Sequence, residues 1–84
     1  ADEISTLMLK NRNKKLLLRL RNSTTLTGIL KDFDIHMNLT LEDVEETDDG
    51  KIRQVGKILL RGDNILLISI SLLVIVSSYN SKLK

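Results

Sequence analysis

Two short stretches of the chain carry polar side chains suited to contact with a nucleic acid base. The first spans residues 33–41 and contains His36 and Asn38, and the second, about twenty residues later, contains Arg61 and Asp63. An imidazole ring or a guanidinium plane can stack on an unpaired base, and a carboxamide offers a donor and an acceptor to its Watson–Crick edge. Uracil has such an edge, with an N3–H donor beside carbonyl acceptors. These residue types form a candidate base-binding set.

Each of these residues also has an ordinary structural explanation. A lone exposed histidine usually has no role, and the run at 61–64 can simply connect two strands, with glycine adopting a positive φ angle and Asp and Asn bonding to nearby backbone. Asn38 stands two residues after His36, however, on the same face of an extended segment. This pairing favours a site over an isolated histidine. We therefore interpret the 61–64 turn as a strand connection that also contributes to this site.

Catalysis and metal binding have little support in the sequence. The chain has one histidine and no cysteine, and it shows no Gly-rich phosphate loop and no recognisable nucleophile or acid/base pattern. We expect a protein that is not an enzyme and that uses no cofactor. Asp48 and Asp49 could hold a cation, but acidic residues before a glycine are more typical of a turn. We therefore expect no metal site.

The composition indicates one small domain that needs an additional source of stability. In a chain of 84 residues a lone hydrophobic core contributes little, which favours oligomerisation, and no cysteine is present to form a disulfide. The absence of cysteine agrees with a reducing intracellular setting. The first residues lack the pattern of a secretory signal, and the apolar run at 65–76 is shorter than the roughly 20 residues that cross a bilayer. We expect a cytoplasmic protein with no membrane association.

Charged residues are segregated along the chain, although the formal net charge is only +2. Seven lysines and arginines lie from Lys10 to Lys31 with no acid among them, and eight acids follow from Asp32 to Asp49 with no lysine or arginine. The pattern predicts two oppositely charged surfaces, of which the basic one would attract phosphate groups. Solvated charges on the outer faces of strands explain the pattern equally well.

Hydrophobic periodicity predicts a short helix followed by a strand. Ile4, Leu7 and Met8 recur at helical spacing behind an acidic first turn, which indicates a helix at about 3–10. Residues 14–21 then alternate between leucines and basic side chains, which is typical of a half-buried strand.

The rest of the chain predicts a mostly β fold. A second strand at 25–33 contains Gly28, which indicates a bulge or a sharp bend. The alternation continues through 33–41 and on pattern alone predicts one unbroken strand there. Two more strands are expected at 51–60, after the hairpin turn 48–50, and from residue 65 onward, after the turn 61–64. About five strongly bent antiparallel strands in so short a chain indicate a small SH3-like or OB-like barrel.

The two polar stretches together resemble the two-part signature of the Sm and Sm-like (LSm) family of RNA-binding ring proteins, above all its archaeal members. The family's first motif has an apolar-x-Gly pattern and a Phe/Tyr-Asp-x-His-Met-Asn-Leu core, and its second has Arg-Gly-Asp/Asn-Asn/Ser between apolar residues. The matching residues are Leu26-Thr27-Gly28-Ile29-Leu30, Phe33-Asp34-Ile35-His36-Met37-Asn38-Leu39 and Ile58-Leu59-Leu60-Arg61-Gly62-Asp63-Asn64-Ile65. The resemblance covers roughly residues 4–69.

The resemblance implies a single Sm-like domain over residues 1–84. Its parts are expected at about 3–10 for the helix, 14–46 for the first motif, 57–69 for the second motif and 70–84 for an apolar C-terminal extension. The implied fold is a five-stranded SH3-like barrel whose edge strands four and five pair with neighbouring copies to close a ring. The resemblance also replaces the unbroken strand at 33–41 with two strand ends and a tight loop.

The resemblance further implies a uridine pocket and residue roles within it. His36 and Arg61 would stack on the base, Asn38 would read its edge, and Asp63 would hold the amide of Asn38. The residues expected to shape the surrounding loops are Asp34, Met37, Gly62 and Asn64.

The function implied is binding of uridine-rich single-stranded RNA in RNA processing, turnover or ribonucleoprotein assembly. The expected partners are that RNA, further copies of the chain in a homo-oligomeric ring, with seven as the leading number, and RNA-processing proteins. The alternative is a ring that acts as a protein scaffold, with only incidental RNA contact. The apolar stretch at 70–76 departs from the family pattern, and it could lengthen the last strand, pack over the barrel or join two rings.

Overall fold

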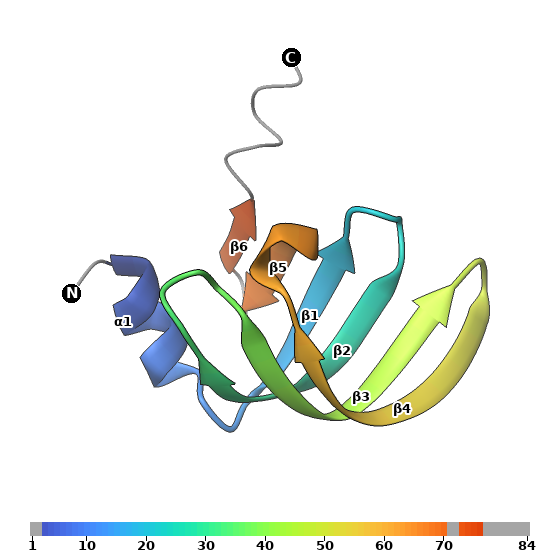
Figure 1. Cartoon of the computed structure of the whole chain (residues 1–84), viewed down its shortest axis with the longest axis horizontal. Helices are drawn as coiled ribbons and strands as arrows, with labels where there is room; N and C mark the ends of the chain where they lie inside the picture. The colour runs from blue at the N-terminus through green and yellow to red at the C-terminus, as the bar shows by residue number, and fades with distance from the viewer. Residues whose placement is uncertain (1–2, 71–72, 77–84) are drawn as a thin grey trace, which may run out of the picture.

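The computed structural model describes residues 3–70 and 73–76 of the chain. Within these residues one helix precedes six strands, with a single 3₁₀ turn between the fourth and the fifth (Figure 1). The elements in chain order are α1 (Glu3–Lys10), β1 (Lys15–Leu20), β2 (Thr25–Phe33), β3 (Leu39–Asp48), β4 (Lys51–Leu60), η1 (Gly62–Asn64), β5 (Ile65–Ile70) and β6 (Leu73–Val76).

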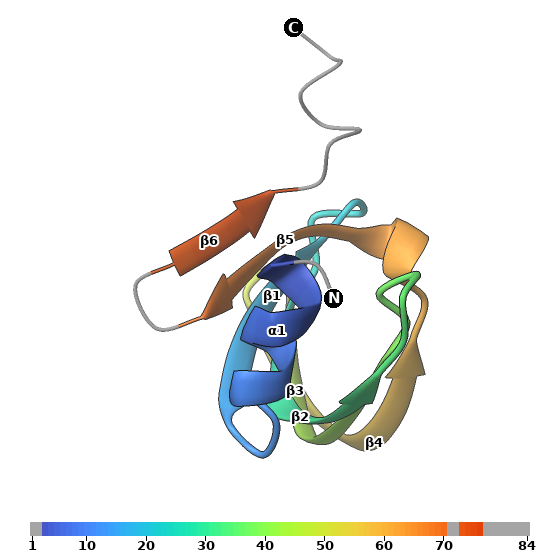
Figure 2. The same cartoon turned by 90° about the vertical axis from the view of Figure 1, so that its left-hand side faces the viewer.

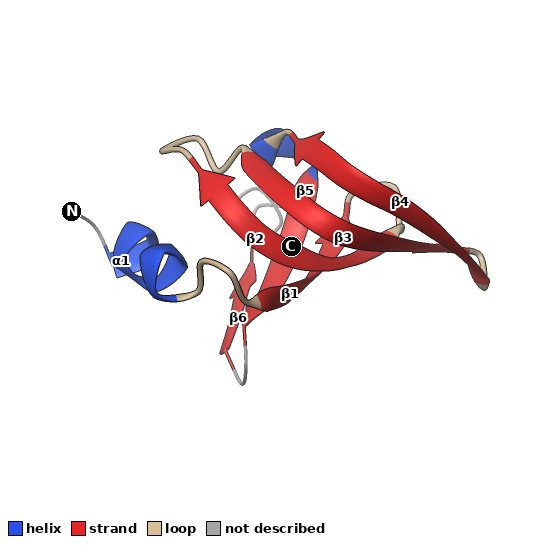
Figure 3. Cartoon of the chain, turned by 90° about the horizontal axis from the view of Figure 1, so that it is seen from below, coloured by secondary structure: helices blue, strands red, loops and turns tan. Residues whose placement is uncertain are grey.

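All six strands form one antiparallel sheet in the order β4-β3-β2-β1-β5-β6. The sheet curls strongly, and α1 lies in front of it on the side of β1 (Figure 2). Seen from below, β4 and β6 lie at opposite edges (Figure 3). The predicted architecture, a short helix followed by a strongly bent antiparallel sheet, is confirmed, and β6 is a strand beyond the expected five.

Bulges produce the curvature. The pairing of β2 with β3 shifts register around Gly28, where a Cβ atom would lie 3.0 Å from Val44 Cγ2 and 3.3 Å from the carbonyl oxygen of Glu42. Glycine therefore lets the two strands approach closely at the bend, as its position in the sequence predicted. A second irregularity between β3 and β4 contains Asp43 and Gly56, both with positive φ angles.

The core lies inside the curved sheet and is almost entirely aliphatic. The helix contributes Met8, which is fully buried, and carries Glu3 in its first turn and Lys10 in its last, as its dipole favours. β1 buries Leu16 and Leu18 and exposes its basic residues, as the alternation predicted. The buried hydrophobic residues are Met8, Leu16, Leu18, Leu26, Leu30, Leu39, Leu41, Val44, Leu60, Ile65, Ile68 and Ile70.

The alternation at 33–41 does not continue as a strand. β2 ends at Phe33, β3 begins at Leu39, and residues 34–38 form a loop in which Met37 has a φ angle of 61°. The pattern-based prediction of one unbroken strand is therefore wrong, and the loop implied by the family resemblance is correct. The expected hairpin turn is present, because Asp49 and Gly50 both adopt positive φ angles between β3 and β4.

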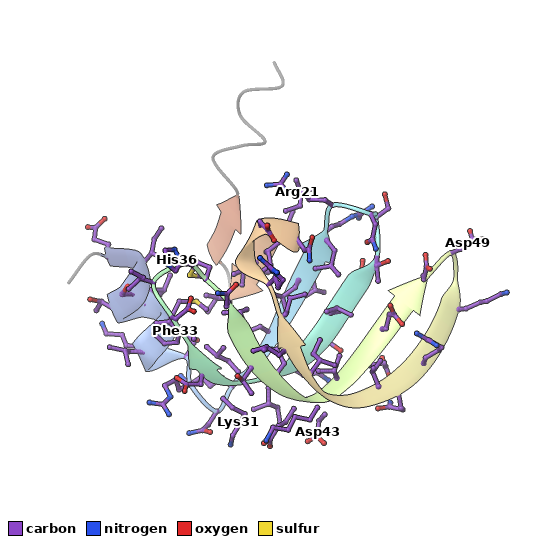
Figure 4. The ribbon with its side chains drawn as sticks, in the orientation of Figure 1. Arg21, Lys31, Phe33, His36, Asp43 and Asp49 are labelled. Atoms are coloured by element: carbon purple, nitrogen blue, oxygen red, sulfur yellow. The ribbon has the colours of Figure 1, made fainter. Side chains whose placement is uncertain are left out.

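The acidic run is partly neutralised by the neighbouring strand. Arg53 of β4 lies 2.6 Å from a carboxylate oxygen of Glu46, and Lys57 lies 3.9 Å from one of Glu42. The acids of β3 are thus not an uncompensated surface. Asp49 marks the tip of this hairpin, far from the loop that carries His36 (Figure 4). No helix within residues 3–70 and 73–76 is long and apolar enough to cross a membrane.

Adjacent leucines of β1 provide a test of the packing. Leu18 is fully buried and Leu17 is 42% exposed. We expect Leu18→Ala to lower the free energy of unfolding by about 2–5 kcal/mol, because it leaves a cavity in the core. Leu17→Ala should cost less than about 1 kcal/mol. Urea unfolding at one protein concentration measures both, and equal losses would contradict this assignment of the core.

Candidate base-binding site

The candidate site lies where the loop between β2 and β3 meets the turn between β4 and β5. These two segments are far apart in the sequence but adjacent in space, and His36 is carried on the first of them (Figure 4). Between them is an open pocket of about 540 Å³. Its lining residues are His36, Met37, Asn38, Arg61, Gly62, Asp63, Ile65, Leu66 and Ile68. The structure thus brings together all four predicted base-binding residues.

The carboxylate of Asp34 organises the first segment. One of its oxygens accepts hydrogen bonds from the backbone N–H groups of His36 (2.9 Å) and Asn38 (3.0 Å), and the other accepts from the side-chain amide of Asn38 (3.0 Å). Asp and Asn close loops in this way because their short side chains reach backbone groups a few residues away. These hydrogen bonds, that of the Asn38 amide first, hold the pKa of Asp34 below its ordinary value.

Asn38 joins the two segments. Its amide nitrogen donates to Asp34, and its amide oxygen accepts a hydrogen bond of 2.8 Å from the backbone N–H of Gly62. These contacts fix which end of the amide is oxygen and which is nitrogen. One N–H and one acceptor position of the amide are left for other partners, in a side chain that lines the pocket.

Gly62 permits this close approach. A Cβ atom at this position would overlap the carbonyl oxygen of His36 and lie 2.9 Å from two backbone atoms of Met37. Backbone atoms cannot move aside as a flexible side-chain end can. Glycine is therefore needed here for space and not for its backbone conformation, since the φ angle of Gly62 is not positive. The prediction that it supplies one is therefore wrong, while its role in shaping the loops is supported.

The role predicted for Asp63 is also corrected. The amide of Asn38 is held by Asp34, and the structure gives no hydrogen bond between the Asp63 carboxylate and Asn38 within the described residues. Asp63 contributes its backbone, because its carbonyl oxygen accepts a hydrogen bond of 2.9 Å from Arg21 Nε. Its side chain is exposed beside the pocket.

Arg21 is a supporting residue that the sequence did not single out. In addition to its contact with Asp63, its backbone N–H donates to the carbonyl oxygen of Asn64 (3.0 Å). Asn64 also donates from its own N–H to the carbonyl oxygen of Arg61 (3.1 Å), which closes the 3₁₀ turn. Arg21 thus ties the end of β1 to this turn (Figure 4). In the sequence it is one of several basic residues, and nothing distinguishes it.

The pocket combines exposed planar groups with an apolar wall. His36 on one segment and Arg61 on the other are both exposed at its rim, and each has a flat π-system. Ile65 and Ile68 of β5 are buried beneath it. The sequence pattern predicted only a strand for these isoleucines, because an apolar strand residue gives no sign of also lining a pocket. A flat, partly polar ring fits such a space chemically.

The fold and the site define a small bent-barrel protein with a polar pocket at the junction of two loops. A family model of the LSM domain matches residues 6–70, and the chain therefore belongs to the LSM, or Sm-like, family. A relative from Methanococcoides burtonii that carries the name snRNP Sm-like protein is 40% identical over 58 residues, which is 68% of this chain and 81% of that protein. A protein of the same name from Archaeoglobus fulgidus is 40% identical over 62 residues, with 70% and 80% covered.

Solved structures agree with this membership. The SmAP1 heptamer of P. aerophilum superimposes with a TM-score of 0.77 at 39% identity, covering 82% of this chain and 93% of that one. The Sm protein of Pyrococcus abyssii, solved in complex with a uridine heptamer, gives a TM-score of 0.74 at 35% identity, covering 81% and 97%. The predicted membership of the Sm-like family is confirmed.

Acid should loosen the loop through Asp34. The lowered pKa means that the folded loop favours the ionised carboxylate, so its stabilisation is fully present above the unfolded value of 3.8 and is lost as pH falls through the lower folded pKa. We expect the backbone amide resonances of His36 and Asn38 to shift together in that window. Asp34→Asn should abolish this step. NMR titration measures it, and an unchanged step in the variant would assign the effect to another group.

Gly62→Ala should separate the two segments. The added methyl group meets backbone, so we expect lower stability and shifted amide resonances at His36 and Met37. Gly50→Ala is the matched control: it meets no atom within 4 Å and bears only the strain of a positive φ angle, about 1–2 kcal/mol. Its effects should stay at the hairpin tip. Unchanged resonances at His36 and Met37 in Gly62→Ala would contradict the close contact.

Proposed function

We propose that this protein is a ring-forming Sm-like protein that binds uridine-rich single-stranded RNA through the pocket between its two loops, in RNA processing, turnover or ribonucleoprotein assembly. The supporting observation is the Asn38 amide, which is fixed at both ends and lines a pocket flanked by His36 and Arg61. A relative of the same fold was solved with a uridine heptamer. RNA-processing proteins are the further partners that this role implies.

The fixed amide gives a reason for preferring uracil. Uracil presents an N3–H donor flanked by two carbonyl acceptors, which complements an amide with one free acceptor and one free N–H. Cytosine presents an acceptor at N3, so it would need the amide ends exchanged. Asp34 and Gly62 oppose that exchange, because a flipped amide would lose both hydrogen bonds. Rejection of cytosine then comes from unpaired polar groups.

Stacking and charge supply the affinity that does not depend on base identity. A base held between the His36 ring and the Arg61 guanidinium would gain from stacking, which contributes about 1–3 kcal/mol per base in single-strand binding proteins. Arg61 also carries a positive charge for the phosphate backbone, which makes the attraction salt-dependent.

A ring would convert weak pockets into a strong binding surface. Related Sm proteins are heptameric, and we propose the same assembly here, with β4 of one copy pairing with β5 of the next. One RNA strand can then occupy several identical pockets, and each added contact benefits from a high effective concentration. Seven copies at +2 each carry +14, which favours association with RNA.

Asn38→Ala tests base reading directly. We expect the variant to lose its preference for decauridine over decacytidine, while its salt-dependent attraction to both remains. Asn22→Ala is the matched control, because Asn22 is an exposed asparagine on the turn between β1 and β2. Arg61→Ala should instead weaken binding of both oligonucleotides. Fluorescence anisotropy at about 150 mM salt, on variants with wild-type circular dichroism, measures all three.

Two results for uridine preference would contradict this proposal. If Asn38→Ala keeps the full preference for uridine, the base is read elsewhere on the protein. If the wild-type protein binds both oligonucleotides equally, the pocket has no reading function, and a protein scaffold becomes the better account of the ring.

A further inference from the structure

The C-terminal strand occupies one edge of the barrel sheet. β6 begins three residues after β5 ends and pairs with it in antiparallel register, from Leu67 opposite Val76 to Ile70 opposite Leu73. It lies beyond residues 6–70, the part of the chain that matches the LSM domain. The outer edge of β5 is therefore covered by the chain itself.

The opposite edge of the sheet is open. β4 has β3 on one side and no strand on its other side within the described residues. Residues 51–57 are all exposed, and the strand also presents Ile52 and Leu59, which are 64% and 75% exposed. A ten-residue edge strand with exposed apolar side chains is a ready template for pairing with another chain.

We propose that β6 is an intramolecular placeholder that covers the β5 edge in the free protomer and is displaced by β4 of a second copy when the ring closes. This inference rests on the proposed ring, because a head-to-tail ring formed by continuing the sheet joins the β4 edge of one copy to the β5 edge of the next. β6 and the incoming β4 compete for the same backbone donors and acceptors of β5.

Different factors favour the pairing of β5 with β6 and its pairing with β4 of a second copy. β6 pairs over four residues and has the high effective concentration of a tethered segment. β4 is ten residues long and would bury apolar side chains that are otherwise exposed. β5 carries no charged residue that would repel the cations of β4. Assembly should therefore depend steeply on protein concentration, and RNA that spans several pockets should favour it.

A reversible lock on β6 tests the placeholder. Ser69 and Val74 are partners in the β5–β6 register, and the chain has no cysteine, so Ser69→Cys/Val74→Cys introduces one possible disulfide. We expect the reduced protein to form rings like the wild type. The oxidised protein should need at least tenfold higher concentration or remain monomeric, as read by native mass spectrometry and light scattering. Unhindered ring formation by the oxidised protein would overturn the proposal.

A second pair controls for the disulfide itself. Thr25 and Thr47 are partners in the β2–β3 register, which the proposed ring leaves intact. Oxidation of Thr25→Cys/Thr47→Cys should leave assembly unchanged. If wild-type, reduced and control proteins all fail to form rings, with or without oligouridine, the proposed ring fails together with the placeholder, whereas rings in every state remove only the placeholder.

Proline variants cover the case in which the double-cysteine protein does not fold. In an antiparallel strand successive N–H groups point to opposite sides, so one of Val74→Pro and Ile75→Pro removes a donor facing β5 and the other removes one facing outward. We expect the variant that loses the donor facing β5 to form rings at lower concentration than the wild type, because its β6 is held less tightly. If both variants weaken assembly, β6 is part of the ring interface and the placeholder is excluded.

Discussion

The hydrogen-bond chain from Asp34 through the Asn38 side chain to the backbone of Gly62 is the interaction on which the site depends. It joins two loops that share no strand pairing, and it orients the one carboxamide in the pocket. Loop backbone has no ladder to satisfy its polar groups, so side chains or water must do so. Asp34 satisfies two N–H groups with one oxygen and the Asn38 amide with the other. Gly62 then allows the contact by presenting no side chain to His36.

The barrel serves this junction by placing the ends of β2, β3, β4 and β5 at one end of a curved sheet. Buried leucines inside the sheet hold the strands, and the bend at Gly28 brings the chain round. Arg21 adds a further tie between β1 and the 3₁₀ turn. The site is thus built on loops but held by rigid strands, an arrangement suited to a pocket that must keep its shape before a ligand arrives.

Much of this fold could be predicted from residue types alone. The alternation of leucines with basic residues specified β1 closely, the strand predicted at 25–33 matches β2, and Asp48-Asp49-Gly50 specified the hairpin, because these signals are local. Alternation failed at 33–41, since a loop held by Asp34 can have the same apolar pattern as a strand. The choice between Asp34 and Asp63 as the partner of Asn38 could not be made from residue types, because both are carboxylates within the two motifs. Only the fold places one of them, Asp34, within hydrogen-bond reach of the Asn38 amide. β6 was missed because a continuous apolar run carries no period that separates one long strand from a hairpin.

The fixed amide of Asn38 should contact the base itself, and its side-chain NH₂ resonances report that contact directly. In ¹⁵N-labelled protein the account predicts that oligouridine shifts the Asn38 side-chain pair strongly, while oligocytidine at equal saturation leaves it near its free position and shifts only groups that sense stacking or phosphate. The side chains of Asn13 and Asn22 provide internal references in the same spectrum, because they lie outside the residues that line the pocket. An Asn38 pair that is unmoved by bound oligouridine, or moved equally by both oligonucleotides, would contradict the account.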